Sequence, residues 1–368
     1  MSTPAATSSP GSFLEQTVSV LSTVAAYMRY MRLPALASAL RSYSFRSAKS
    51  TSTTSSSRSS SFARAYQRAH NAISSRCRSA GELTDVAQGV AALLTSLLYF
   101  KQKALIYPSH MPPNSRTDVP RPSQFGIRDF EELVIPTTDG EKLSAFYIRG
   151  PRRGRHTKCT IVMFHGNAGN IGHRLPIARM LINYVGCNVF MLEYRGYGLS
   201  TGEPDEKGLM IDAQTALDYL RDRAETRSHK LVIYGQSLGG AVSIKLVQKN
   251  QHAGDIVGLV LENTFLSMRS LIPSVIPPAK YLAMLCHQVW PSESLIPNIT
   301  EIPILFLSGL QDEIVPPRHM RKLYELATTP TKIWKPLPGG DHNSSVLEEG
   351  YFEAISEFVS NVAGDEKL

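Results

Sequence analysis

The stretch Gly235-Gln236-Ser237-Leu238-Gly239 is a G-x-S-x-G motif, whose central serine can act as a nucleophile when the chain turns sharply around it. The apolar run 231–234 before it predicts a strand, and residues 240–248 after it are compatible with a helix. This order of strand, tight turn and helix lifts a serine hydroxyl above the edge of a sheet. The alternative is a glycine-rich loop in which Ser237 merely caps the helix.

A serine hydroxyl needs a base to take its proton and a carboxylate to orient that base. Asp312 follows the apolar run 304–307 and is our candidate for the carboxylate. Glu313 is the nearest rival, and a plain helix-start carboxylate ahead of two prolines is the structural alternative. His342 lies in a glycine-rich loop and is our candidate base, whereas His319 falls in a predicted helix and is expected to serve only packing or the surface.

The negative charge that develops during acyl transfer needs backbone N–H groups aimed at it in advance. We expect the amide of Leu238, directly after the nucleophile, to supply one of them. The other is expected from the loop 165–170 that follows a predicted strand at 159–164, with Asn167 the first choice and Ala168 the second. A phosphate-binding role for this loop is disfavoured because it has neither a Walker lysine nor G-x-G-x-x-G spacing.

The elements that must position these residues alternate along the chain. Strands are predicted near 130–136, 142–149, 159–164, 188–193, 231–234, 257–261, 303–307 and 332–335, with a hairpin around Thr138–Gly140. Helices are predicted near 173–185, 209–224, after Ser237, and at 317–327 and 349–361. Such alternation predicts an α/β fold whose mostly parallel central sheet is covered by helices on both faces. The apolar, proline-rich residues 264–298 interrupt it, as a small cap over the serine or as a helix packed on the sheet.

Several motifs together resemble the α/β-hydrolase superfamily, and within it a subgroup of membrane-anchored serine hydrolases. This subgroup contains the fungal bud-emergence and cell-polarity hydrolases and animal α/β-hydrolase-domain proteins. The motifs are Leu105-Ile-Tyr-Pro-Ser109, Phe164-His-Gly-Asn-Ala-Gly-Asn170, Glu193-Tyr-Arg-Gly-Tyr-Gly-Leu-Ser200, Tyr234-Gly-Gln-Ser-Leu-Gly-Gly240, Glu262-Asn-Thr-Phe265 and Gly340-Asp-His-Asn343. The resemblance covers roughly residues 99–362 and implies a triad of Ser237, Asp312 and His342.

The N-terminal part of the chain has a different composition. Residues 1–80 carry a net charge of +9 and are rich in serine and arginine, so we expect a disordered leader over 1–81, or a transit peptide. Residues 82–101 include fifteen consecutive uncharged positions, 86–100. This is short for a bilayer span and could be a buried helix, but the family resemblance implies an anchor there. The catalytic domain is then 102–368, with 264–298 as its cap or lid region.

The rest of the composition limits the kinds of partner and cofactor that we expect. Beyond residue 80 the net charge is only −1, so nothing argues for nucleic acid. The four cysteines are scattered without a C-x-x-C pair, which indicates neither a disulfide framework nor a zinc site, and we expect no metal or cofactor.

The sequence therefore predicts a serine hydrolase acting on a carboxylic ester or thioester, with a lipid-like acyl group or an acylated protein as substrate. The alternative is a polarity or trafficking scaffold in which the hydrolase domain mainly binds a partner. We expect a single-pass protein of the endoplasmic reticulum, another endomembrane or the plasma membrane, with a mitochondrial location as the alternative.

Overall fold

The computed structural model describes residues 88–89, 92–93, 95–96, 99–275, 281 and 283–364. The chain divides into two units, of which the larger comprises Gln102–Ser274 and His287–Leu368 and the other Met1–Lys101 and Val275–Cys286. The expected leader, 1–81, lies outside the described residues, as does much of the expected anchor, 82–101. Within the described residues no helix combines the length and the apolar character needed to cross a membrane.

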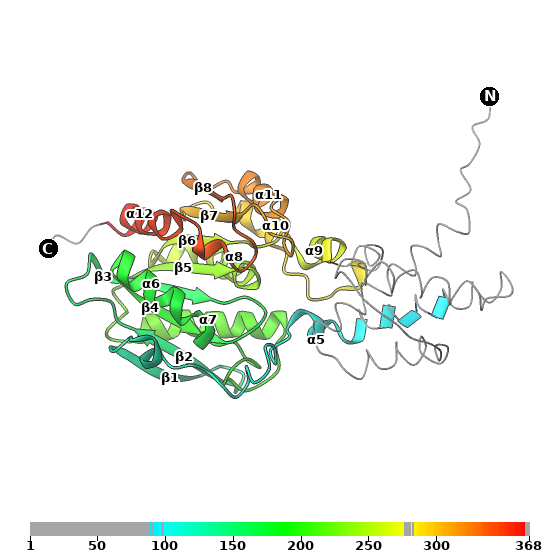
Figure 1. The fold of residues 1–368 in the computed structure, drawn as a ribbon, viewed down its shortest axis with the longest axis horizontal. Coiled ribbons are helices and arrows are strands. Elements are labelled where there is room, and N and C mark those ends of the chain that lie inside the picture. The colour runs from blue at the N-terminus through cyan, green and yellow to red at the C-terminus, as the bar shows by residue number, and fades with distance from the viewer. Residues whose placement is uncertain are drawn as a thin grey trace, which may run out of the picture. The chain divides into compact units, whose positions relative to one another are not determined.

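An eight-stranded sheet forms the centre of the larger unit (Figure 1). Its strands are β1 (Phe130–Pro136), β2 (Lys142–Ile148), β3 (His156–Phe164), β4 (Cys187–Leu192), β5 (Lys230–Gln236), β6 (Ile256–Glu262), β7 (Ile304–Gly309) and β8 (Lys332–Leu337). Their order across the sheet is β1-β2-β4-β3-β5-β6-β7-β8, and only β2 runs antiparallel to its neighbours. The predicted fold class, a mostly parallel sheet of the α/β-hydrolase type, is confirmed.

Helices cover both faces of the sheet. The α-helices are α5 (Gln102–Ile106), α6 (Leu175–Val185), α7 (Glu206–Asp222), α8 (Leu238–Asn250), α9 (Met268–Val275), α10 (Ser292–Leu295), α11 (Arg318–Leu326) and α12 (Tyr351–Ala363). The 3-10 helices are η1 (Pro122–Phe125), η2 (Ile171–Arg174), η3 (Gln251–Ala253), η5 (Ala283–Leu285), η6 (Ile296–Asn298) and η7 (Ser345–Leu347). Helix α6 packs beside α12 on one face, and α8 packs beside α7 and α10 on the other.

The side chains of successive residues in each central strand point to opposite faces of the sheet. Val232 and Tyr234 of β5 pack in the cluster under α6 and α12, whereas Ile233 between them is buried on the opposite side. Phe306 of β7 packs edge-on against Tyr324 of α11, with ring centroids 5.4 Å apart. Because both faces are buried, the parallel strands read as continuous apolar runs in the sequence.

The predicted boundaries differ from the observed ones at a few places. The hairpin joining β1 and β2 is confirmed, since Thr137 and Glu141 close the turn around Thr138–Gly140. Helix α7 begins at Glu206 rather than near 209, because the Asp205 carboxylate accepts the N–H of Gly208 at 2.7 Å and caps it. Within 264–298 the described residues form α9, which contains Pro273, and short turns of helix.

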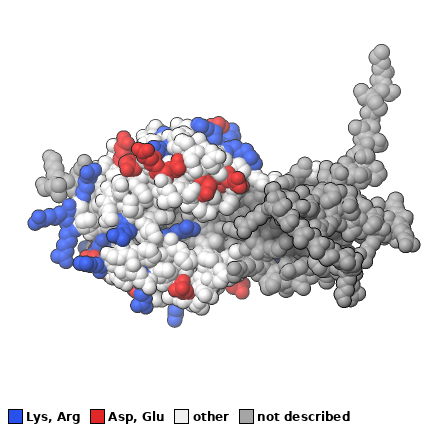
Figure 2. Space-filling view, in the orientation of Figure 1, with Lys and Arg blue, Asp and Glu red and all other residues white. Residues whose placement is uncertain are grey.

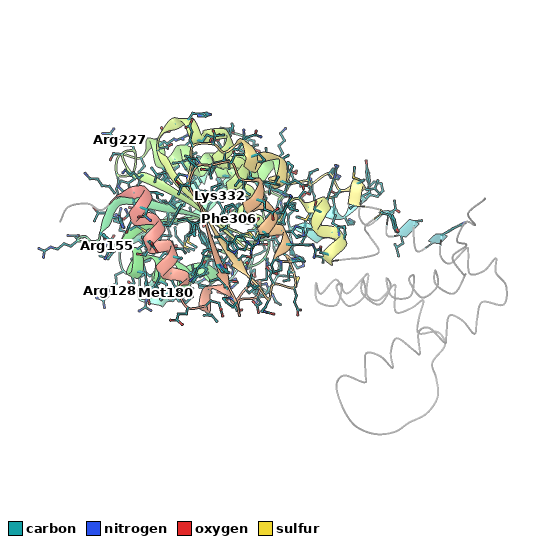
Figure 3. The ribbon with its side chains drawn as sticks, turned by 90° about the horizontal axis from the view of Figure 1, so that it is seen from above. Arg128, Arg155, Met180, Arg227, Phe306 and Lys332 are labelled. Carbon is teal, nitrogen blue, oxygen red and sulfur yellow. The ribbon has the colours of Figure 1, made fainter. Side chains whose placement is uncertain are left out.

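Three arginines lie at the end of the larger unit where the parallel strands begin. Arg128, Arg155 and Arg227 precede β1, β3 and β5, and Figure 3 shows them at one end of the larger unit. This is the end where the parallel strands begin. On the face shown in Figure 2, acidic and basic side chains form small groups separated by uncharged surface. The parallel strands end at the opposite edge, where α/β folds place their functional residues.

Gly239 offers a test of how closely α8 lies against β3. A Cβ at this position would stand 2.0 Å from the carbonyl oxygen of Phe164, which is backbone and cannot move aside. We expect Gly239→Ala to lower the free energy of unfolding by more than about 3 kcal/mol, above the usual cost of overpacking. Gly254→Ala is the control, because its Cβ meets nothing within 4 Å and only the positive φ of 82° opposes it. Urea denaturation of both variants measures the difference, and equal losses would contradict the close packing.

Candidate active site

Ser237 lies in a sharp turn between β5 and α8. Its φ and ψ are 54° and −117°, a strained conformation for a residue with a side chain. The backbone is held on both sides: the Ser237 N–H donates to the carbonyl of Glu262 at 2.8 Å, and the Thr264 hydroxyl donates to the Ser237 carbonyl at 2.7 Å. The side chain makes no capping hydrogen bond to α8. The alternative in which Ser237 serves as a helix cap is therefore wrong.

The structure brings Ser237, His342 and Asp312 into one hydrogen-bonded chain. Nε2 of His342 lies 3.0 Å from Oγ of Ser237, and Nδ1 of His342 lies 2.7 Å from Oδ2 of Asp312. The Asp312 side chain is 1% exposed and that of His342 is 11% exposed, so the contact is shielded from water while the histidine remains at the surface of the site. This arrangement can move a proton from the serine to the histidine.

Asp312 is itself oriented by the turn that carries it. Its Oδ1 accepts the N–H groups of Ile314 and Val315 at 2.9 and 2.8 Å, which leaves Oδ2 for His342. The neighbouring Glu313, the rival candidate, is exposed. The two backbone donors thus explain why a carboxylate at 312 rather than 313 faces the histidine.

The predicted oxyanion-binding residues flank Ser237. Leu238 is the first residue of α8, so its N–H has no partner within the helix. The loop after β3 comes close, since a Cβ at Gly166 would lie 3.7 Å from the Cβ of Ser237. The Asn167 side chain turns away, and its Nδ2 donates to the carbonyl of Ile106 at 3.1 Å. Asn167 can therefore contribute to oxyanion binding only through its backbone N–H.

The end of β6 fastens the loops that carry the site. The Asn263 side chain donates to the carbonyl of Asp341 at 3.1 Å and accepts the N–H of Gly309 at 2.8 Å. It therefore ties the His342 loop to the end of β7. Asn263 itself has a positive φ of 44°. Together with Thr264, which holds Ser237, it gives a structural reason for the Glu262-Asn-Thr-Phe265 motif.

A buried carboxyl group lies beneath the same loops. Glu262 is fully buried and accepts hydrogen bonds from the hydroxyls of Tyr351, at 2.6 Å, and Tyr234. Burial raises the pKa of Glu262, and the tyrosine hydroxyls oppose that rise. Nε2 of Gln236, next to the serine, lies 3.4 Å from both Oε1 of Glu262 and the carbonyl of His342. This network links the buried carboxyl to the histidine loop.

Sequence reasoning missed the roles of Gln236, Glu262, Asn263 and Thr264. The only signal was their presence in motifs, because their partners lie in loops far along the chain. The described residues include no group of three or more His, Cys, Asp or Glu side chains that could hold a metal ion. Cys159, Cys187 and Cys286 are buried.

Comparisons with known proteins agree with this architecture. The family profile described as serine aminopeptidase, S33, matches residues 155–300, which include Ser237 but neither Asp312 nor His342. The chain is 43% identical over 278 residues to Protein bem46 of Schizosaccharomyces pombe, covering 74% of this chain and 92% of that protein. It is 41% identical over 275 residues to an uncharacterized membrane protein of Saccharomyces cerevisiae, covering 74% and 94% of the two chains.

Among solved structures, an α/β-hydrolase from Vibrio vulnificus is similar in fold, with a TM-score of 0.55 at 20% identity over 72% of this chain and 92% of that one. The fold and these matches define the class of the protein, an α/β-hydrolase. The chain belongs to the α/β-hydrolase superfamily, in the group that includes the fungal Protein bem46.

His319, the other histidine near Asp312, should govern stability rather than reaction. It lies in α11, and its Nδ1 accepts the N–H of Leu266 at 3.4 Å. Burial lowers the pKa of His319 from 6.5 to about 4. Between pH 6.5 and pH 4, His319 is therefore protonated in the unfolded chain but not in the folded protein. The folded state therefore loses stability as the pH falls below 6.5, and this loss is complete near pH 4.

We expect His319→Gln to reduce the loss of folding stability between pH 6.5 and pH 4, because the amide oxygen can still accept the N–H of Leu266 and does not titrate. Urea denaturation at pH 7.5 and pH 5 checks the slope for the variant and the unmodified protein. Activity at pH 7.5 should be retained, since His319 is not part of the Ser237–His342–Asp312 chain. The same pH slope in both proteins would show that another group controls acid stability.

Proposed function

We propose that the protein is a serine hydrolase that cleaves a carboxylic ester or thioester through an acyl-enzyme. Ser237 is the nucleophile, His342 the general base and Asp312 the group that orients it. The observation that carries the proposal is the continuous contact from Ser237 Oγ to His342 Nε2, at 3.0 Å, and from His342 Nδ1 to Asp312 Oδ2, at 2.7 Å. A scaffold that only binds partners would not need this alignment.

In the proposed reaction, Oγ of Ser237 bonds to the carbonyl carbon of the substrate while its proton passes to Nε2 of His342. The carbonyl oxygen becomes an oxyanion and accepts hydrogen bonds from the N–H groups of Leu238 and Asn167. His342 then gives its proton to the leaving alcohol or thiol, and the carbon–heteroatom bond breaks. A water molecule, deprotonated by His342, attacks the acyl-enzyme and releases the acid and the free serine.

A lipid-like acyl group is the proposed substrate class. Residues 264–298 are the proposed cap or lid within the catalytic domain, 102–368. Within the larger unit, two large apolar side chains of the turn that carries Asp312, those of Leu310 and Ile314, are 40% and 42% exposed. Exposed apolar side chains favour an apolar ligand or a lipid surface over a strongly charged substrate. The aminopeptidase description of the matching family profile makes an aminoacyl amide the second substrate to test.

Substitution of the three proposed catalytic residues tests the function. Ser237→Ala should abolish covalent labelling by a fluorophosphonate and hydrolysis of p-nitrophenyl esters, because no other group replaces the nucleophile. Asp312→Asn should lower kcat by about 10⁴-fold, since an amide favours the wrong tautomer of His342. Glu313→Gln, at the exposed neighbour, is the matched control and should stay near the unmodified rate.

The same assay separates the substrates. Acyl chains of increasing length, an acyl thioester and an amino acid p-nitroanilide are compared, and the longer acyl chains should give the higher kcat/KM. Labelling that persists in a folded Ser237→Ala protein would refute the assignment. An unmodified protein that neither labels nor hydrolyses any of these substrates would favour the scaffold.

We also propose that residues 82–101 form a single-pass anchor in the endoplasmic reticulum, another endomembrane or the plasma membrane, following a leader at 1–81. The similarity to the Saccharomyces cerevisiae relative, which is named as a membrane protein, supports this. The full chain should stay in the pellet after alkaline carbonate extraction. A chain that starts at Gln102, where the larger unit begins, should move to the supernatant. Release of the full chain by carbonate would exclude the anchor, and import into mitochondria would favour the alternative location.

A further inference from the structure

Side chains hold three successive carbonyl groups of the loop after β3. The hydroxyl of Tyr194 donates to the carbonyl of His165 at 3.1 Å, and that of Tyr197 donates to the carbonyl of Asn167 at 2.9 Å. Between them, Nδ1 of His165 lies 2.7 Å from the carbonyl of Gly166. Both tyrosines come from the turn that follows β4, so one short segment holds two of the three carbonyls.

These contacts also fix the N–H groups of the loop. A peptide unit is planar and trans, so its carbonyl and its N–H point in opposite directions. The carbonyl of Gly166 shares a peptide plane with the N–H of Asn167, and the carbonyl of Asn167 shares one with the N–H of Ala168. A donor that fixes the first carbonyl therefore fixes the amide of Asn167, the one proposed to bind the oxyanion.

The contacts of His165 determine where its protons lie. A carbonyl oxygen can only accept, so Nδ1 must carry a hydrogen to bond Gly166. Nε2 lies 3.0 Å from Oε1 of Glu193, within ion-pair distance, although the two atoms are not aligned as a hydrogen bond and neither has a hydrogen-bond partner in the described part of the chain. The side chains of His165 and Glu193 are 3% and 0% exposed. With Nδ1–H on the carbonyl of Gly166, Nε2 is the ring atom that faces the Glu193 carboxylate.

Glu193 is held in place for this contact. Its Oε2 accepts the N–H of Ile171 at 3.0 Å. Gly198 leaves room for the carboxylate, because a Cβ there would lie 2.1 Å from the same Oε2. The motif residues Glu193, Tyr194, Tyr197 and Gly198 thus all act on the loop 165–167 or on the carboxylate that faces it.

We propose that His165 and Glu193 are positioning residues for oxyanion binding. Glu193 lies against Nε2 of His165 and orients the ring, whose Nδ1–H bonds the carbonyl of Gly166 and thereby aims the N–H of Asn167 at the reacting carbonyl. The proposal rests on the serine hydrolase function, and it adds two residues that do not touch the substrate. Loss of the Nδ1 donor should slow acyl transfer without weakening substrate binding.

Phenylalanine substitutions at two histidines of the same strand region test this. His165→Phe keeps the ring volume but removes the donor, and should lower kcat by about 10²-fold with KM nearly unchanged, as for loss of an oxyanion contact. His156→Phe is the matched control. His156 is buried at the start of β3, and its ring contacts the Gly364 carbonyl and the Ser360 hydroxyl, each at 3.1 Å. It should retain kcat, and thermal melting of both variants reports folding.

Variants at Glu193 keep the test decisive if His165→Phe does not fold. Glu193→Gln can donate an amide N–H to Nε2, which preserves the Nδ1–H of His165, so kcat and the rate of fluorophosphonate labelling should stay near those of the full, unmodified chain. Glu193→Leu leaves Nε2 without a partner and should lower both by about tenfold or more. Equal kcat in His165→Phe and His156→Phe, or equal losses in the Gln and Leu variants, would overturn the positioning role alone. An unmodified protein that does not label would overturn the hydrolase function itself.

Discussion

The geometry of the site depends on how closely neighbouring backbone segments can approach one another around Ser237. The strained turn is possible only because β5, α8 and the end of β3 approach one another without side chains between them. A Cβ at Gly235 would lie 2.2 Å from the carbonyl of Gly239, and one at Gly240 would lie 2.5 Å from the side chain of Thr264. These positions of the motif therefore require glycine because a Cβ would clash, and not because the chain must be flexible there. In the turn so formed, the serine hydroxyl contacts Nε2 of His342 at 3.0 Å.

The strained turn and its neighbouring loops are kept in place by polar groups at the ends of two strands. The end of β6 supplies Asn263 and Thr264, which hold the histidine loop and the serine backbone. The end of β4 supplies a second support, anchored by Arg195, which pairs with the buried Asp212 and with Asp139. Burial raises the pKa of Asp212 to about 6, whereas hydrogen bonds from Arg195 and Thr137 lower the pKa of Asp139 to about 2. Hydrogen-bonded networks of this kind hold loops in one arrangement.

The sequence predicted the strands, most helices and the three residues that meet at the site, because these features leave local signals. Apolar runs of four to six residues between turn residues define β5 and β7, Ser237 and Asp312 come a few residues after these runs, and His342 lies in a glycine-rich loop. Contacts made across the sheet left no such signal. Nothing near His165 indicates that it contacts Glu193, which follows the end of the neighbouring strand β4, or that Asn263 joins the Asp341 loop to the end of β7 at Gly309. The motifs identified these residues as a set, but only the strand order β4-β3-β5-β6 explains why they act together.

The segment before β1 completes this network and explains the Leu105-Ile-Tyr-Pro-Ser109 motif. The carbonyls of Ile106 and Met111 accept hydrogen bonds from the Asn167 side chain, at 3.1 Å, and from the Gly169 N–H, at 2.7 Å. The Tyr107 hydroxyl, which accepts from the Trp290 indole at 2.8 Å, donates to Gln288 at 2.9 Å. The loop that carries the proposed oxyanion amide is thus bound on one side by the turn after β4 and on the other by the first residues of the larger unit. Because hydrogen bonds fix it from both sides, the loop cannot shift toward or away from Ser237 without breaking contacts to segments that are remote in sequence.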